Sequence, residues 1–148
     1  YRTEFDKDPF YKIQHYPGMP ETLKTLKQNG VKLGVCSNKP HEAAVKVVKR
    51  MFGDQVFDMV MGQSDSIRKK PAPDGPLKIA EAFGVLPEEC MYLGDSGTDM
   101  QTGKAAGMYT VGVLWGYREK EELLKNGADA LVESPEDILD LYEEKCSK

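Results

Sequence analysis

Short apolar runs alternate with amphipathic stretches from about residue 17 onward, and this alternation restricts the fold more than any other feature of the sequence. Strands joined by helices form right-handed crossovers, which place parallel strands in one sheet with helices on both faces. The sequence therefore predicts an α/β fold with a parallel sheet flanked by helices. The predicted strands are Val31–Cys36, Val56–Met61, Cys90–Leu93, Tyr109–Val113 and Ala130–Val132, and the predicted helices are Met19–Asn29, His41–Phe52, Pro76–Phe83, Thr98–Ala106, Glu119–Asn126 and Pro135–Lys145.

Residues 1–16 do not follow this alternation. They contain five aromatic side chains but no strand pattern, and Tyr16-Pro17-Gly18 joins them to the alternating part of the chain. We interpret residues 1–16 as a linker or as the end of another element. Residues 17–148 are interpreted as one α/β core, because a chain of 148 residues has the length of a single domain.

Composition argues against several classes of partner. The chain has 24 acidic and 20 basic residues and a net charge of −4, whereas nucleic acid or an anionic membrane surface requires a basic patch. No apolar run approaches the roughly 20 residues that span a bilayer. The three cysteines, Cys36, Cys90 and Cys146, are odd in number and far apart, which favours a reducing cytoplasm.

Three of the predicted strands are followed by side chains that can bind a phosphate or a cation. Because the carboxyl ends of parallel strands lie at one edge of a sheet, we expect a hydroxyl, an ammonium and two carboxylates to meet there. The side chains are Ser37 and Asn38 after the first strand, Lys69 and Lys70 after the second, and Asp95 and Asp99 after the third.

The first two groups suit a phosphate. Ser37 and Asn38 supply a hydroxyl and an amide beside the free N–H groups of a helix start, although the same residue types also serve as helix N-caps. Lys70 precedes Pro71-Ala72-Pro73, whose prolines keep the backbone extended, so its ammonium can be directed at a phosphoryl group. Lys69 is a second candidate for that role.

The third group suits a metal ion. Asp95 and Asp99 flank a Ser-Gly-Thr turn between a strand end and the next helix, and two carboxylates at that spacing can share a hard cation such as Mg²⁺. A helix N-cap would explain one aspartate without a metal. It would not explain why both lie beside Gly94 and Gly97, where a ligand can approach the backbone closely.

Three segments together resemble the haloacid dehalogenase superfamily, in particular its phosphoglycolate phosphatase-like branch. The flanking segments Tyr16–Leu23 and Gly103–Met108 also resemble that branch, so the likeness extends over about residues 16–132. It implies a Rossmann-like parallel sheet with a helical cap, and residues 1–16 resemble the end of that cap. The three segments are Val35-Cys36-Ser37-Asn38-Lys39-Pro40, Lys70-Pro71-Ala72-Pro73 and Leu93-Gly94-Asp95-Ser96-Gly97-Thr98-Asp99-Met100.

The resemblance also implies a role for each residue at the predicted edge. Ser37 would bind the transferred phosphoryl group with help from Asn38, and Lys70 would pair with the phosphate and the nucleophile. Asp95 would bind Mg²⁺ directly, and Asp99 would be a second ligand, directly or through a water. The implied function is Mg²⁺-dependent hydrolysis of a small phosphorylated metabolite through an aspartyl-phosphate. Phosphoglycolate as the substrate is suggested by the branch alone.

The Asp-x-Asp strand end that carries the nucleophile in this family does not occur in the sequence. Asp6-Lys7-Asp8 matches the Asp-x-Asp pattern, but no apolar strand precedes it and Pro9 follows. We therefore reject it as the nucleophile motif. In the family this strand lies between the strands that here end at Ser37 and Asp95. We therefore expect a core that lacks its first strand and most of the cap. This incomplete core is expected to be inactive by itself. It is also expected to be unstable or self-associating, unless it pairs with the missing N-terminal segment.

Two other functions stay open from the sequence. A non-catalytic module with the same fold would bind phosphate or a partner, and the absence of the nucleophile motif favours it if that absence is genuine. A sugar-phosphate mutase or a dehalogenase would keep the family but change the reaction, although the ending Thr98-Asp99-Met100 favours the phosphatase branch. An upstream apolar strand ending in Asp-x-Asp-Gly would separate the catalytic from the binding hypothesis.

Overall fold

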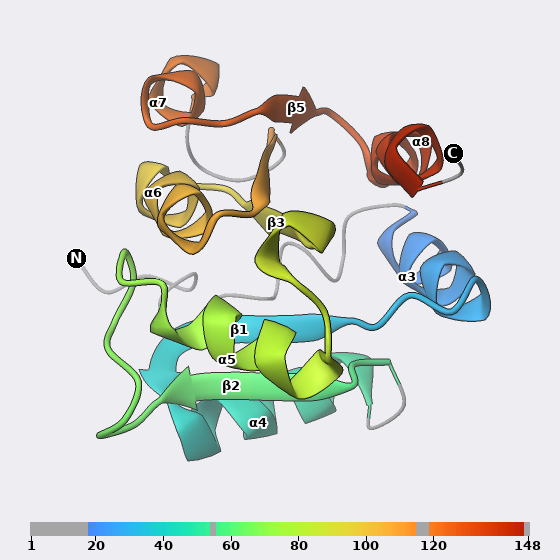
Figure 1. Cartoon of the computed structure of the whole chain (residues 1–148). Helices are drawn as coiled ribbons and strands as arrows, with labels where there is room; N and C mark the ends of the chain where they lie inside the picture. The colour runs from blue at the N-terminus through green and yellow to red at the C-terminus, as the bar shows by residue number, and fades with distance from the viewer. Residues whose placement is uncertain (1–17, 54–55, 115–118, 147–148) are drawn as a thin grey trace.

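The computed structural model describes residues 18–53, 56–114 and 119–146, which form parallel strands flanked by helices (Figure 1). The α/β fold class predicted from the alternating pattern is therefore confirmed. Residues 1–16, interpreted above as a linker or cap end, lie outside the described residues. In chain order the elements are α3 (Met19–Gln28), β1 (Gly34–Pro40), α4 (His41–Phe52), β2 (Met59–Gln63), α5 (Asp74–Phe83), η1 (Pro87–Glu89), β3 (Met91–Gly94), α6 (Gly97–Ala106), β4 (Tyr109–Val113), α7 (Lys120–Lys125), β5 (Ala130–Val132) and α8 (Pro135–Cys146).

The strands form two parallel sheets rather than the single sheet that the sequence predicts. β1 pairs with β2, with Val35 opposite Val60, and β4 pairs with β3 on one side and β5 on the other. In Figure 1, β3 lies on the side of β1 away from β2, yet no ladder joins β1 to β3 in the part of the chain described. The sheet is thus divided where the family resemblance places an additional strand.

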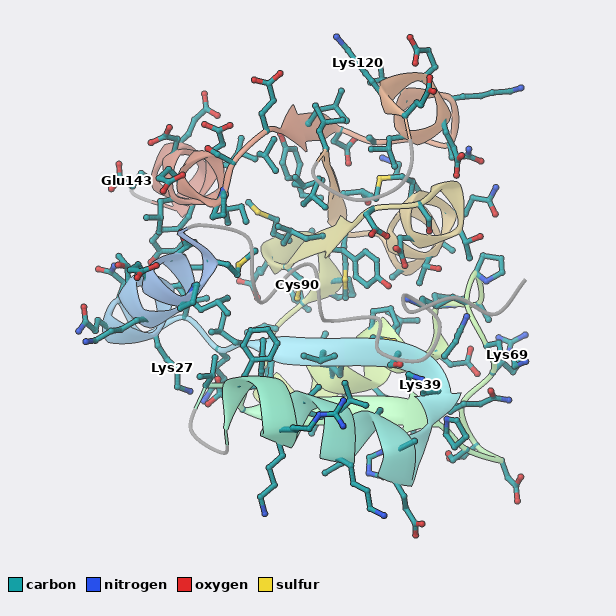
Figure 2. The ribbon with its side chains drawn as sticks, turned by 180° about the vertical axis from the view of Figure 1, so that it is seen from behind. Lys27, Lys39, Lys69, Cys90, Lys120 and Glu143 are labelled. Atoms are coloured by element: carbon teal, nitrogen blue, oxygen red, sulfur yellow. The ribbon has the colours of Figure 1, made fainter. Side chains whose placement is uncertain are left out.

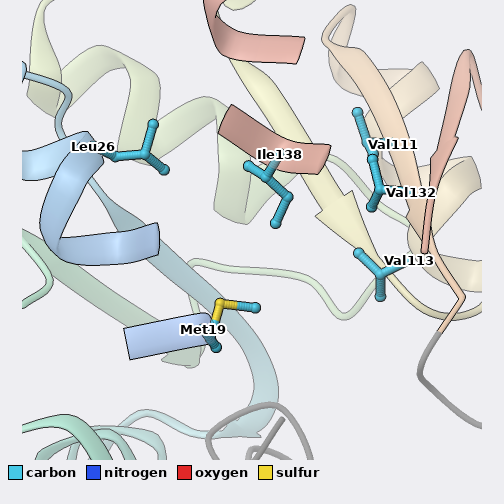
Figure 3. Close-up of a cluster of buried hydrophobic side chains, with 6 residues drawn as sticks. All are labelled: Met19, Leu26, Val111, Val113, Val132 and Ile138. Atoms are coloured by element: carbon cyan, nitrogen blue, oxygen red, sulfur yellow. The ribbon is translucent and has the colours of Figure 1, made fainter. Parts of the chain in front are cut away.

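Helices cover both parts and hold them together. α4 packs on β1 and β2, α6 packs on β3 and β4, and α5 contacts elements of both parts. α3 and α8 lie side by side, so the beginning and the end of the described chain meet (Figure 1). Between these helices and β4 lies a cluster of buried side chains (Figure 3). Its members are Met19, Leu26, Val111, Val113, Val132 and Ile138.

β1 begins three residues later than predicted because the apolar residues before it make other contacts. The N–H of Val31 donates to the carbonyl of Leu26 and closes the end of α3. The N–H of Leu33 donates to the Asp58 carboxylate at 2.7 Å, so the ladder starts only at Gly34. The strand then continues to Pro40, which lies opposite Gln63. β2 is displaced in the same direction as a consequence.

α5 begins at Asp74, two residues before the predicted start at Pro76. Pro76 fits this first turn because the N–H groups of a first helical turn have no partner within the helix. Gly75 is buried against the Cys36 side chain, and a β-carbon at position 75 would collide with the Cys36 sulfur. This contact joins the start of α5 to β1. The short helix η1 was not predicted from the sequence.

We expect amide hydrogen exchange of the 148-residue chain to separate β4 from the strands beside the division. β4 has a partner on each side and is largely buried, whereas among the described strands β1 and β3 each have a partner on one side only, and Leu93 of β3 is 37% exposed. Alternate N–H groups of a strand paired on one side point away from its partner and exchange readily. Equal protection of β1, β3 and β4 would contradict this arrangement.

Candidate functional site

An ion pair between Lys70 and Asp99 connects the two sheets. Lys70 lies in the loop between β2 and α5, and Asp99 lies in the first turn of α6, directly after β3. The Lys70 Nζ is 2.8 Å from the Asp99 Oδ1, and the two side chains are only 17% and 13% exposed. The structure thus brings together the lysine and one of the aspartates that the sequence places at a common edge.

The surroundings of Lys70 keep its ammonium charged. Burial by itself lowers the pKa of this amine, whereas Asp99 raises it through its charge and its hydrogen bond, and the pKa lies above its usual range. The two titratable neighbours, Cys36 and Tyr92, stay neutral, since burial raises the pKa of both the thiol and the phenol. An ammonium has three N–H donors, and Asp99 accepts one of them.

The Asp99 carboxylate is fixed by donors from its own turn. Its Oδ2 accepts the Asp95 N–H at 3.2 Å and the Ser96 hydroxyl at 3.1 Å, while the Asp99 N–H donates to the Ser96 Oγ. Ser96 is therefore the N-cap of α6, and neither aspartate has the capping role that the sequence left open. Gly94 is required here, because a β-carbon at that position would collide with the Asp99 side chain.

The end of β1 reaches the same loop through Asn38. The Asn38 Oδ1 accepts the Lys70 backbone N–H at 2.9 Å, so one residue of β1 anchors the backbone of the predicted phosphate-binding lysine. The Ser37 Oγ accepts the Lys39 N–H at 3.1 Å. Neither side chain caps α4, whose N-cap is Pro40 without a side-chain hydrogen bond. Neither Ser37 nor Asn38 is therefore the helix N-cap that the sequence left open.

The two candidate lysines differ in their surroundings. The side chain of Lys70 is turned inward to Asp99. Lys69 is exposed, and Figure 2 shows it on the outside of the loop at the end of β1 and β2. Of the two, only Lys70 is in contact with the residues that follow β1 and β3. Its role toward phosphate stays a prediction.

A second ion pair closes the loop that carries Lys70. The Arg68 Nη2 donates to the Asp74 Oδ1 at 2.8 Å, and the Arg68 Nε lies 3.1 Å and 3.0 Å from the two oxygens of the same carboxylate. The Arg68 backbone N–H also donates to the Asp74 Oδ2 at 3.0 Å. We refer to Arg68 and Asp74 as the loop clamp. The clamp was not predicted from the sequence, although an arginine and an aspartate stand at the two ends of a proline-containing loop.

The carboxylates at this edge are ligands of the kind that Mg²⁺ prefers. Both Asp99 oxygens accept hydrogen bonds from the chain, so Asp99 would bind a cation only in exchange for one of these contacts. Among residues 18–53, 56–114 and 119–146, no three acidic, histidine or cysteine side chains gather closely enough to hold a metal ion. Mg²⁺ normally keeps several waters and uses one or two protein carboxylates, so a single aspartate is compatible with it.

The chain belongs to the haloacid dehalogenase-like hydrolase family, whose profile matches residues 6–107. It is 33% identical over 143 residues to a phosphoglycolate phosphatase of Aquifex aeolicus, and 34% identical over 124 residues to that of Escherichia coli K12. These alignments take in 97% and 84% of the chain. The predicted family and its phosphoglycolate phosphatase-like branch are therefore confirmed, as is the likeness to phosphoric monoester hydrolases.

Solved structures share the fold. A crystal structure from Lactobacillus delbrueckii subsp. bulgaricus superimposes with a TM-score of 0.81 at 37% identity, over 90% of this chain and 58% of that one. A β-phosphoglucomutase from Clostridium difficile gives a TM-score of 0.71 at 25% identity, over 90% of this chain and 58% of that one. One fold thus accommodates proteins named for different reactions.

The chain spans only part of the length of its relatives. It covers 66% of the Aquifex protein and 49% of the Escherichia coli protein. The sequence prediction of a core without its first strand and most of the cap agrees with these proportions and with the divided sheet. Within the described residues, no helix is both long enough and apolar enough to span a membrane.

We expect the stabilising effect of the loop clamp to disappear in acid. The hydrogen bonds and charge of Arg68 lower the pKa of Asp74 from 3.8 to about 2. A carboxyl with a depressed folded pKa stabilises the fold above its unfolded pKa and loses that effect as pH falls through the folded pKa. The difference in unfolding free energy between wild type and Asp74→Asn should therefore be constant above about pH 5 and shrink toward pH 2. Urea titrations across this range measure it, and a difference independent of pH would contradict the assignment.

Proposed function

We propose that this chain is the greater part of the catalytic core of a Mg²⁺-dependent phosphatase that hydrolyses a small phosphate monoester. The observation that carries this proposal is the series of bonds Asn38–Lys70–Asp99–Asp95, which runs from the end of β1 to the end of β3. It places a charged ammonium over the division between the sheets. A phosphoryl group at this position would face a fixed positive charge in a partly buried environment, where such a charge is most effective.

The residues of this chain would bind and orient the phosphoryl group. Lys70 would neutralise charge on its oxygens, with Ser37 donating its hydroxyl and Asn38 holding the Lys70 backbone in place. Asp95 would hold Mg²⁺, and Asp99 would keep the lysine and the Asp95 backbone in position. Mg²⁺ supplies additional stabilisation of the negative charge that develops on the phosphoryl oxygens.

The nucleophile in this proposal comes from a strand outside the described residues that fills the division between β1 and β3. In the described part of the chain, neither β1 nor β3 has a strand partner on that side. A parallel strand in that position would end beside Lys70, at the edge where ligands bind in open α/β sheets. An aspartate at its carboxyl end would attack the phosphorus and form an aspartyl-phosphate that water then hydrolyses.

Phosphoglycolate is the first substrate to test, because the relatives from Aquifex aeolicus and Escherichia coli carry that name. The fold does not select it, since a β-phosphoglucomutase shares the architecture. We also propose that the protein acts in the cytoplasm without nucleic acid or membrane partners. The alternative is a phosphate- or partner-binding module without catalysis, and the two experiments below distinguish it from an enzyme.

In the longer polypeptide that includes the upstream strand, we expect Lys70→Ala and Asp95→Ala each to reduce phosphatase activity by about 10²–10³-fold. That is the usual effect of removing one preorganised group that stabilises developing charge. The assay is hydrolysis of p-nitrophenyl phosphate and of phosphoglycolate with and without Mg²⁺. Lys69→Ala is the matched control and should retain near-wild-type activity, because Lys69 is exposed. Near-wild-type turnover by Asp95→Ala would exclude the metal assignment.

The 148-residue chain alone should show no Mg²⁺-dependent turnover of either ester, because the proposed nucleophile lies on a strand outside it. The longer polypeptide with the upstream strand, assayed in parallel, should be active. Turnover by the short chain at a comparable rate would mean that the nucleophile lies within residues 1–148. Absence of activity in both, together with retained phosphate binding, would favour the non-catalytic module.

A further inference from the structure

We propose that Arg68 and Asp74 are positioning residues that set the location of the Lys70 ammonium. The proposal rests on the phosphatase function proposed above. Neither side chain is in the group that faces phosphate. They act on the loop between β2 and α5, which carries Lys70 at its centre, and they join the two ends of that loop.

The residues just outside the clamp are fixed by burial. Ile67 is 7% exposed, and its N–H donates to the Ser64 carbonyl at 3.0 Å. Gly75 is buried against Cys36 on the other side. Between these two points the chain runs through exposed residues at Arg68, Lys69 and Pro71, so it has little apolar contact of its own. Within this stretch the Ala72 N–H donates to the Lys69 carbonyl at 3.0 Å, and the clamp joins its two ends.

Lys70 itself is held at two atoms, its backbone nitrogen and its Nζ, and the clamp restrains the loop that carries both. Its backbone N–H is fixed by Asn38 and its Nζ by Asp99, which are contributed by different sheets. A loop free to shift would move the lysine backbone relative to both partners. The arginine fork restrains that shift because its Nε and Nη2 donate to the two oxygens of one carboxylate, which fixes direction as well as distance.

The position of Asp74 also suits this task. It is the first residue of α5, where a negative charge interacts favourably with the helix dipole. It accepts both the backbone N–H and the side chain of Arg68, so the carboxylate is shared between main chain and guanidinium. The Arg68 side chain is 74% exposed, and exposed ion pairs add little to global stability. Breaking the clamp therefore lowers the unfolding free energy only slightly, and its main consequence is for the position of the loop.

The first test is Asp74→Asn in the active longer polypeptide, assayed with p-nitrophenyl phosphate. We expect kcat to fall about tenfold with little change in KM, because a misplacement of about 1 Å in a positioned group can cost up to roughly 10²-fold in rate. The matched control is Asp58→Asn, which removes a comparable carboxylate that pairs with Lys27 at 2.9 Å far from the loop. That variant should keep kcat.

A double-mutant cycle separates a joint action of the two side chains from two independent effects. Asp74→Ala should lower kcat more than Arg68→Ala, because Asp74 also binds the Arg68 backbone N–H. Arg68→Ala should then have no further effect in the Asp74→Ala background. Additive losses would overturn the proposal, since they would mean that the residues do not act through each other.

Limited trypsin digestion gives a readout independent of activity. Lys69 is exposed, and the bond after it should be cleaved several times faster in Asp74→Asn than in wild type or Asp58→Asn, since only the first variant opens the loop. Unchanged cleavage together with unchanged kcat would overturn the proposal. A wild-type protein without phosphatase activity would instead overturn the proposed function, while faster cleavage in Asp74→Asn would still support the clamp.

Discussion

The pairing of one buried ammonium with one buried carboxylate is the interaction on which the rest of the site depends. Lys70 and Asp99 come from different sheets, and each is fixed by a further bond: the Lys70 backbone N–H donates to the Asn38 side chain, and the Asp99 carboxylate accepts the Asp95 N–H. Removing either partner would leave an uncompensated charge in a partly buried position, which is strongly destabilising. The same pair therefore fixes the geometry of the edge and keeps the Lys70 ammonium in place.

Much of the fold and part of the site follow from the sequence alone. The alternation of strands and helices predicts every strand and the long helices, because periodicity and glycine stops are local properties. The three motifs predict that Lys70 and Asp99 meet, because parallel strands end at one edge. The local pattern does not predict the division of the sheet. That division depends on a strand that is not among the described residues.

The missed interactions are long-range or compete with local preferences. Asn38 resembles a helix cap, but it binds the Lys70 backbone 32 residues away. Leu33 resembles the middle of a strand, but its N–H binds the Asp58 carboxylate and delays the ladder. Ser96 takes the capping role that the sequence had offered to an aspartate. In each case a polar group of the side chain or the backbone had two satisfactory hydrogen-bond partners in principle, and only the three-dimensional arrangement selects between them.

The ammonium at the division between the sheets also restricts what can lie next to it. A strand that enters between β1 and β3 must end close to Lys70, whose charge is largely shielded from water. An apolar residue at that end would place no acceptor beside the Lys70 ammonium, which is paired with Asp99. A carboxylate there would accept a hydrogen bond from it and favour its charged form. The half of the site that the chain contains would therefore be complemented best by an acidic group.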